Sequence, residues 1–272
     1  MEKVGIIGFG NMGRAIAQRI KDKYAVSIFD KDKNKISVLN NIAVCSTLLE
    51  LVKQSEIIIL AIKPQDFKSL FNEIKSYVGD KLIITIAAGI TTRYIKHCSS
   101  DKIRIIRVMP NMAAQIGMSV SVVFKDNNAT EKDLDLARKL LSCIGVVLVV
   151  QEEKMMNAAT AVSGSGPAFF CHHIKDNKNV DQERDEFIKM LAEAAVSVGF
   201  DYLKANVLSE KTVDGVIAML KEKNLTCAQI IKMVSSKGGT TLAGLKVLDA
   251  GGTLKDAVKS ASRRAEELGE KD

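Results

Sequence analysis

The sequence predicts an α/β domain with a doubly wound, mostly parallel sheet, followed by an all-α domain. In the first half, short apolar runs such as EIIILAI alternate with amphipathic segments, which is typical of strands covered on both faces. After about Gln151 no comparable strand run occurs, and long amphipathic segments follow one another. We therefore predict two domains, residues 1–152 and residues 153–272.

Eight strands are predicted in the first domain from runs rich in β-branched residues, the third of them short and weak. They are Lys3–Gly8, Ala25–Asp30, Ile42–Val44, Glu56–Ala61, Leu82–Ala87, Ile103–Val108, Ser119–Phe124 and Val146–Val150. The segments between them show helical periodicity. The clearest of these predicted helices are Asn11–Lys21, Gln65–Tyr77 and Glu131–Cys143.

The second domain is predicted to consist of amphipathic helices joined by polar loops. The predicted helices are Met155–Val162, Arg184–Val198, Asn206–Glu222, Thr226–Lys232, Thr241–Asp249 and Leu254–Leu268. Ser209 and Thr226 are expected to be N-caps, because their hydroxyls can accept from free backbone amides. The segment Ser163–Pro167 is expected to be a loop, and the polar segment 175–186 an exposed loop or helix end.

Composition excludes several function classes. The 272 residues carry a formal net charge of +7, but 39 basic residues are interleaved with 32 acidic ones. Tryptophan is absent and aromatics make up 5%, so we expect no nucleic-acid partner. Five dispersed cysteines indicate reduced thiols and no metal site. No apolar stretch has the length of a membrane span and no signal peptide is evident, so we expect a soluble cytoplasmic protein without membrane contact.

A glycine-rich turn, GFGNMG, lies between the first predicted strand and the first predicted helix. In this position Gly8 permits the tight turn, Gly10 permits a pyrophosphate to approach the backbone, and Gly13 permits close helix–sheet packing. Amides at the start of the helix would then face the phosphates. The predicted cofactor residues of this turn are Gly8, Phe9, Gly10, Asn11, Met12 and Gly13.

The residues after the second predicted strand bear on the choice of cofactor. Asp30 stands where an acid usually bonds the ribose hydroxyls, which favours NAD. Lys31 and Lys33 follow, and a lysine can neutralise a 2′-phosphate, so NADPH and NADH both remain open. The alternative is that these lysines belong to a charged turn that caps the next helix.

Further cofactor contacts are expected where the next strands end, because ligands of open α/β sheets bind outside the carboxyl ends of strands. These predicted residues are Ala61, Lys63, Pro64, Ala87 and Gly89. The segment Val108–Asn111 ends the strand after these.

A second candidate site is SSKGGTT, Ser235–Thr241, which runs directly into a predicted helix. Its glycines let the backbone curl, its hydroxyls supply donors, and the helix N-terminus directs amides at a negative group. A small carboxylate would suit such a site. The alternative is a serine or threonine N-cap after a flexible turn.

Six stretches together resemble the pyrroline-5-carboxylate reductase family. In chain order they are VGIIGFGNMG, AIKPQ, IAAGI, RVMPN, AVSGSGPAF and SSKGGTTLAGLKVLDAGG. The resemblance implies a Rossmann domain followed by a helical domain that interlocks with another subunit, giving a homodimer or a higher homo-oligomer built from dimers. It also implies reduction of the ring C=N bond of L-1-pyrroline-5-carboxylate to L-proline, the last step of proline biosynthesis, with NADPH or NADH.

The resemblance also assigns residues in the second site. The implied substrate-binding residues are Ser236, Gly238, Gly239, Thr240 and Thr241, with the Ser163–Pro167 segment shaping the pocket. The catalytic candidate is Thr241, whose hydroxyl would lie near the ring nitrogen. Lys237 departs from the family, which would be expected to carry proline there, and adds a charge beside the substrate carboxylate.

Three other functions remain open from the sequence. They are another Rossmann-plus-helical dehydrogenase, a reductase of a different cyclic imine, and a non-catalytic sensor that binds NAD(P). A 3-hydroxyacid dehydrogenase would be expected to carry a catalytic lysine in a GxxxK-like context, and Lys246 does not fit that spacing. His172 and His173 are adjacent on a predicted helix and point in different directions, which favours a surface or interface role over metal binding.

Overall fold

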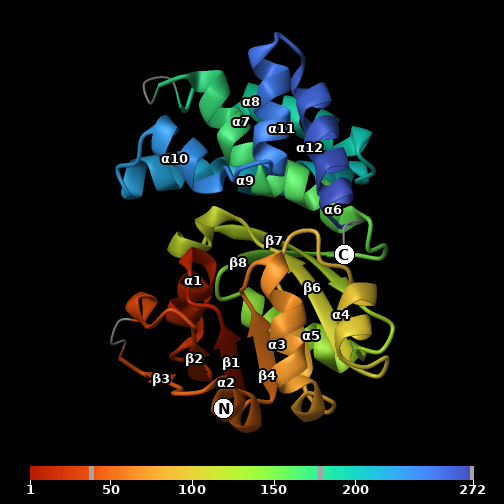
Figure 1. The fold of residues 1–272 in the computed structure, drawn as a ribbon. Helices are drawn as coiled ribbons and strands as arrows, with labels where there is room; N and C mark the ends of the chain where they lie inside the picture. The colour runs from red at the N-terminus through yellow and green to blue at the C-terminus, as the bar shows by residue number, and fades with distance from the viewer. Residues whose placement is uncertain (37–39, 177–179, 270–272) are drawn as a thin grey trace.

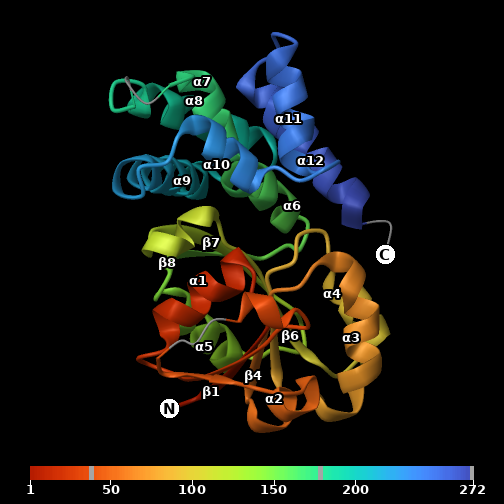
Figure 2. The same ribbon diagram turned by 60° about the vertical axis from the view of Figure 1, so that its left-hand side comes forward.

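The structure, a computed structural model, describes residues 1–36, 40–176 and 180–269. It has a lower part built on a β-sheet and an upper part built from helices, as Figure 1 and the rotated view in Figure 2 show. The N-terminus lies at the far end of the sheet part, and the described chain ends close to the junction of the two parts (Figure 1). The predicted fold class, a doubly wound sheet domain followed by an all-α domain, is confirmed.

All eight predicted strands are present, with small shifts at their ends. They are β1 (Lys3–Ile7), β2 (Ala25–Phe29), β3 (Ile42–Val44), β4 (Ile57–Leu60), β5 (Leu82–Thr85), β6 (Arg104–Met109), β7 (Ser119–Lys125) and β8 (Gly145–Val150). They form one sheet in the order β3-β2-β1-β4-β5-β6-β7-β8. Every pairing is parallel except that of β6 with β7. The strand order reverses between β1 and β4, which is where such sheets bind ligands.

Helices cover both faces of this sheet. They are α1 (Asn11–Ile20), α2 (Leu48–Gln54), α3 (Phe67–Ile74), α4 (Thr92–Cys98) and α5 (Glu131–Leu141). One hydrophobic cluster joins α1 and α5 to one face, and another joins α2, α3 and α4 to the other. Two of these helices, α2 and α4, were not predicted; they are short and have threonine N-caps at Thr47 and Thr91.

The second part of the chain contains seven helices among the described residues. They are α6 (Met155–Ala159), α7 (Gly166–Ile174), α8 (Arg184–Ser197), α9 (Tyr202–Glu222), α10 (Cys227–Val234), α11 (Thr240–Asp249) and α12 (Leu254–Gly269). The expected N-cap at Thr226 is confirmed, with a capping box to Gln229. The expected N-cap at Ser209 is wrong: α9 begins earlier, after Asp201, whose carboxylate accepts from the Lys204 amide.

The segment Ser163–Pro167 is not the loop that the sequence suggested. Residues Thr160–Gly164 form a π-helical turn that leads almost directly into α7. Pro167 is tolerated because it lies in the first turn of α7, where its missing N–H costs no hydrogen bond. A side chain at Gly166 would press on Thr212 of α9, so the glycine serves close helix packing. The chain therefore stays helical here despite its turn-like composition.

The two parts share a continuous hydrophobic core. Val120 and Val122 of β7 belong to the same cluster as Phe169 of α7 and Val216 of α9. The predicted boundary at 152/153 falls between β8 and α6. Of the polar segment 175–186, residues 177–179 lie outside the described residues, and its last residues already belong to α8.

Two further observations concern the chain as a whole. The five cysteines form no disulfide with one another. Among the described residues, no helix combines the length and the apolar character needed to cross a bilayer.

Candidate active site

The glycine-rich turn forms a cradle with one open side. Gly8 has φ +97°, and a Cβ there would overlap the carbonyl oxygen of Ala61. A Cβ on Gly13 would overlap the carbonyl oxygen of Gly8, so this residue fixes α1 tightly against the turn. A Cβ on Gly10, by contrast, would meet nothing within 4 Å. The turn is thus packed against the protein at Gly8 and Gly13 and has open space at Gly10, where α1 begins. A pyrophosphate could bind in this space.

Asp30 ties this turn to the end of β2. Its carboxylate accepts from the amide of Phe9 at 2.7 Å and from the amide of Asp32 at 2.8 Å, and the residue is 6% exposed. The ammonium of Lys31 lies 2.6 Å from the carboxylate of Asp66, and this hydrogen bond raises the pKa of Lys31. Asp30 therefore supports the cradle through the backbone, and its contact with a ribose stays a prediction.

A cleft of about 280 Å³ lies where the two parts of the chain meet. Its walls include Asn11, Met12, Pro110 and Asn111 from the sheet domain, and Gly164, Met233 and Val234 from the helical domain. The start of α1 and the π-helical turn thus face one cavity, although they are distant in sequence. The cleft therefore brings the start of the phosphate cradle and the helical domain together.

The second candidate site adjoins the same cleft through a buried hydroxyl network. The hydroxyl of Thr241 donates to the carbonyl of Val234 at 2.9 Å and lies 3.1 Å from the hydroxyl of Ser165. Ser165 also lies 3.1 Å from the hydroxyl of Thr240. Thr241 and Ser165 are 3% and 0% exposed. The structure therefore joins the SGSGP and GGTT motifs, as the resemblance implied.

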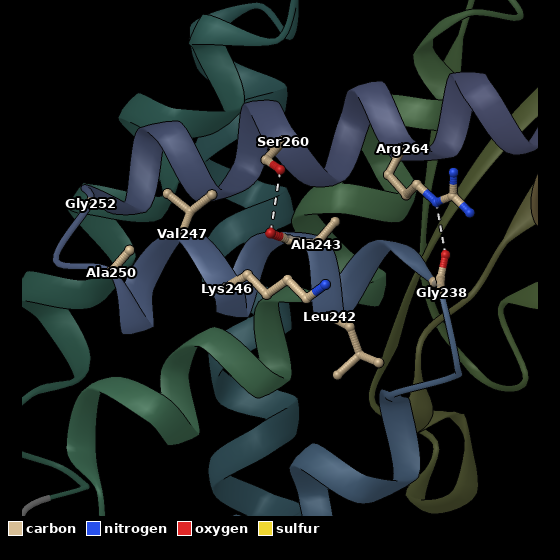
Figure 3. Close-up of a pocket in the computed structure, with 10 residues that line it drawn as sticks. Gly238, Leu242, Ala243, Lys246, Val247, Ala250, Gly252, Ser260 and Arg264 are labelled. Atoms are coloured by element: carbon tan, nitrogen blue, oxygen red, sulfur yellow. Dashed lines mark hydrogen bonds between the residues drawn. The ribbon is translucent and has the colours of Figure 1, made fainter.

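The rest of the predicted substrate turn faces a different cavity. Gly238 and Gly239 line a groove of about 730 Å³ between α11 and α12. Figure 3 shows Arg264 of α12 reaching across to the turn, where its Nε donates to the Gly238 carbonyl at 2.8 Å. Gly238 has φ +70°, a conformation that favours glycine. Ser236 and Lys237 are exposed.

Several predicted cofactor residues lie outside both cavities. Only Asn11 and Met12 line the cleft, and the others are Gly8, Phe9, Gly10, Gly13, Asp30, Lys31, Ala61, Lys63, Pro64, Ala87 and Gly89. Gly89 lies against the end of α12, near the backbone of Leu268 and Gly269. Their contacts with a cofactor stay predictions.

Sequence reasoning did not assign several residues that line the cleft. Asn111, Gln115 and Met233 were absent from the predicted site. The signal for Asn111 was its place directly after a predicted strand, in the RVMPN stretch. Met233 carried no such signal, because a methionine at helical spacing is usually a core residue.

Sequence comparisons identify relatives over the whole chain. A family model described as pyrroline-5-carboxylate reductase dimerisation matches residues 185–268, and one described as NADP oxidoreductase, coenzyme F420-dependent, matches residues 3–89. A pyrroline-5-carboxylate reductase from Aquifex aeolicus is 31% identical, with 98% of this chain and 97% of the relative covered. One from Methanosarcina acetivorans is 32% identical, with 99% of each chain covered.

Solved structures give the same result. The Plasmodium falciparum pyrroline carboxylate reductase with NADP bound matches with a TM-score of 0.64 at 26% identity, covering 98% of each chain. A pyrroline-5-carboxylate reductase from Coxiella burnetii matches with a TM-score of 0.65 at 26% identity, covering 97% of each chain. Both likenesses extend over the sheet domain and the helical domain together.

Proposed function

Since the chain belongs to the pyrroline-5-carboxylate reductase family, we propose that it reduces L-1-pyrroline-5-carboxylate to L-proline with NADPH. The observation that carries this proposal is the cleft that the start of α1 shares with Val234, whose carbonyl accepts from Thr241. The phosphate cradle thus opens toward the helical domain one hydrogen bond away from the candidate substrate turn, which suits an oxidoreductase acting on a small anionic imine. The chain is accordingly an NAD(P)H-dependent oxidoreductase acting on a C=N bond.

The residues of the chain hold and orient the reactants. The amides at the start of α1 would bind the pyrophosphate at the open side of Gly10, and the bound NADPH supplies the hydride. The turn 238–241 presents amides at the N-terminus of α11 to the substrate carboxylate. A cyclic imine is a good hydride acceptor once protonated, so the protein chiefly needs to position the ring and exclude water.

Thr241 is placed to accept rather than to donate a hydrogen bond. A carbonyl oxygen can only accept, so the bond to Val234 uses the single hydroxyl proton of Thr241. The Ser165 hydroxyl oxygen is a second acceptor for this proton, at 3.1 Å, so the lone pairs of the Thr241 oxygen remain for the N–H of a protonated imine. We infer that Thr241 positions the ring nitrogen and that the proton comes with the substrate or from solvent.

NADPH is favoured over NADH by the charges at the end of β2. Lys31, Lys33 and Lys35 follow Asp30, and both carboxylate oxygens of Asp30 already accept backbone amides. Such a cationic segment suits a 2′-phosphate. The NADP bound by the Plasmodium falciparum relative agrees with this choice.

The chain forms homo-oligomers through its helical domain, and we propose that the basic unit is a dimer. The segment that matches the dimerisation model, residues 185–268, contains both helices of the groove between α11 and α12. Figure 3 shows Leu242, Ala243 and Val247 along this groove. A second copy seated in it would lie beside Gly238 and Gly239 and would complete the substrate site.

A coupled assay tests the proposed function. The purified protein should oxidise NADPH, measured at 340 nm, only when pyrroline-5-carboxylate is present, and L-proline should accumulate in equal amount. The six-membered-ring homologue of the imine and NADH serve as the comparison substrate and cofactor. NADPH binding without imine-dependent oxidation would indicate a sensor, and faster turnover of the homologue would indicate a different imine reductase.

A further inference from the structure

Asn111 carries a buried hydrogen-bond donor that no described part of the protein uses. The residue is 3% exposed and lines the cleft between the two domains. Its side-chain nitrogen Nδ2 is buried and has no hydrogen-bond partner. Unpaired polar groups of this kind are rare in folded proteins, so each one needs an explanation.

The orientation of this side chain is fixed by its other atoms. The Oδ1 of Asn111 accepts from the amide of Ala113 at 3.2 Å and caps the short 3₁₀ helix Met112–Ile116. Its own backbone amide donates to the hydroxyl of Ser119 at 3.1 Å. Rotating the amide would place an NH₂ group against the Ala113 amide, where two donors would face each other. The Nδ2 is therefore held in one direction.

The position of Asn111 in the sheet indicates which ligand it meets. It follows β6, which lies beyond β4 and β5 from β1, on the side of the glycine turn opposite to β2. A dinucleotide lies across the strand-order reversal, with one mononucleotide over each half of the sheet. The β2 half carries Asp30 and the lysines expected at the adenosine ribose. The other half, with Asn111, is then the nicotinamide half, and Gly164 brings the helical domain to it.

We propose that Asn111 binds the nicotinamide half of the cofactor, with Nδ2 donating a hydrogen bond to an oxygen of the nicotinamide riboside. This assignment rests on the proposed function for the identity of the dinucleotide. A bound cofactor would give the unpaired Nδ2 an acceptor. The hydrogen bond from the Ala113 amide to Oδ1 would hold the side chain in the required orientation. A ring held at this point would lie in the cleft beside Val234, whose carbonyl accepts from Thr241.

Paired binding measurements test the assignment. Asn111→Ser keeps a neutral side chain that can cap the 3₁₀ helix but lacks the Nδ2 donor. We expect its affinity for NADP⁺ to fall about tenfold by isothermal titration calorimetry. Its affinity for 2′,5′-ADP, which lacks the whole nicotinamide riboside, should stay within twofold of the wild type. Asn206→Ser, a change at a half-buried asparagine of α9 that lines neither cavity, is the matched control and should alter neither value.

A second variant and the possible outcomes make the test decisive. Asn111→Asp keeps the shape and the capping oxygen but lacks the Nδ2 donor. Like Asn111→Ser, it should weaken the binding of NADP⁺ more than the binding of the ligand that lacks the nicotinamide riboside. Equal weakening of both ligands would overturn the proposal and assign Asn111 to support of the turn. Unchanged binding with a raised KM for the imine would overturn it in favour of a substrate contact. A wild type that binds NADP⁺ but reduces no imine would refute the proposed function while the binding comparison still supports the role of Asn111.

Discussion

At the scale of single residues, the hydroxyl of Thr241 links the substrate turn to the rest of the site. It contacts Val234 at the end of α10 and Ser165 at the start of α7. Because Thr241 and Ser165 are buried, these hydrogen bonds restrict the turn more than exposed bonds would. Thr241 therefore has both a structural and a proposed chemical role.

Replacing Thr241 with valine should separate these roles. The change keeps the side-chain shape but removes the oxygen that would accept from the imine. We expect kcat to fall about five- to twelvefold, since a lost hydrogen bond of about 1–1.5 kcal/mol in the transition state has this effect. NADP⁺ affinity should stay within twofold. Thr212→Val, at a buried hydroxyl bonded only within α9, is the control, and equal kcat losses in both variants would argue against a role in turnover.

The glycines of the cradle should respond differently to the same substitution. Gly10→Ala adds a methyl group to open space, so the melting temperature should change little while NADP⁺ affinity falls about tenfold. Gly13→Ala forces a methyl group into the Gly8 carbonyl and should destabilise the domain by about 1–3 kcal/mol. Urea unfolding and calorimetric titration of both variants measure these effects. A Gly10→Ala variant with normal NADP⁺ affinity would place the pyrophosphate elsewhere.

At the scale of secondary-structure elements, one ion pair joins three segments near the site. Arg107 of β6 is 3% exposed and donates to the carboxylate of Glu153 at 2.8 Å. That carboxylate also accepts from the amide and hydroxyl of Thr92, at 2.7 and 3.0 Å, and so satisfies the first turn of α4. Burial lowers the pKa of the Arg107 guanidinium, and Glu153 opposes this shift. The pair fixes the connection between the two domains.

Glu153→Gln should therefore be strongly destabilising. It leaves the buried guanidinium of Arg107 without a counter-charge, which costs about 3 kcal/mol in comparable pairs. Urea denaturation gives the free energy of unfolding. Glu152→Gln is the matched control, because Glu152 pairs with Lys154 at the surface and should contribute less than about 1 kcal/mol. Equal effects at both positions would show that the buried pair adds nothing specific.

At the scale of the whole molecule, the groove between α11 and α12 is the surface that the protomer leaves open. It joins the apolar side chains of Leu242 and Val247 to the substrate turn at Gly238. Burying this groove against a second copy would remove apolar surface from water and enclose the turn. We therefore expect assembly and activity to be coupled in this protein.

Ala250→Glu should disrupt the assembly without unfolding the protomer. Ala250 lines the groove and is exposed in the protomer, so the added carboxylate has no intramolecular clash but would be buried, uncompensated, in a dimer. We expect a shift toward monomer in sedimentation velocity and a raised KM for the imine. Ala43→Glu, at an exposed alanine of β3, is the matched control. A variant that remains dimeric would place the interface elsewhere.

Local pattern was sufficient for most of the fold. The eight strands were predictable because each is a short β-branched run, and the cradle because its glycines follow a strand and precede a helix. Prediction was wrong where a long-range contact overrode local chemistry. Ser209 has the composition of an N-cap, yet it is fully buried inside α9, where packing extends the helix to Asp201. The SGSGP segment stays helical because its small residues permit contact with α9.

The sequence by itself determined the two-domain architecture, the phosphate cradle and the family, because these depend on periodicity, on glycine spacing and on motifs read in order. Only the tertiary structure decided that Ser165 meets Thr241, that Asp30 supports the glycine turn, and that Asn111 lines the cleft with a buried, unpaired donor. The physical reason is that hydrogen-bond partners lie far apart in the chain. Which donors are satisfied follows from where the folded segments meet, and no local pattern records that.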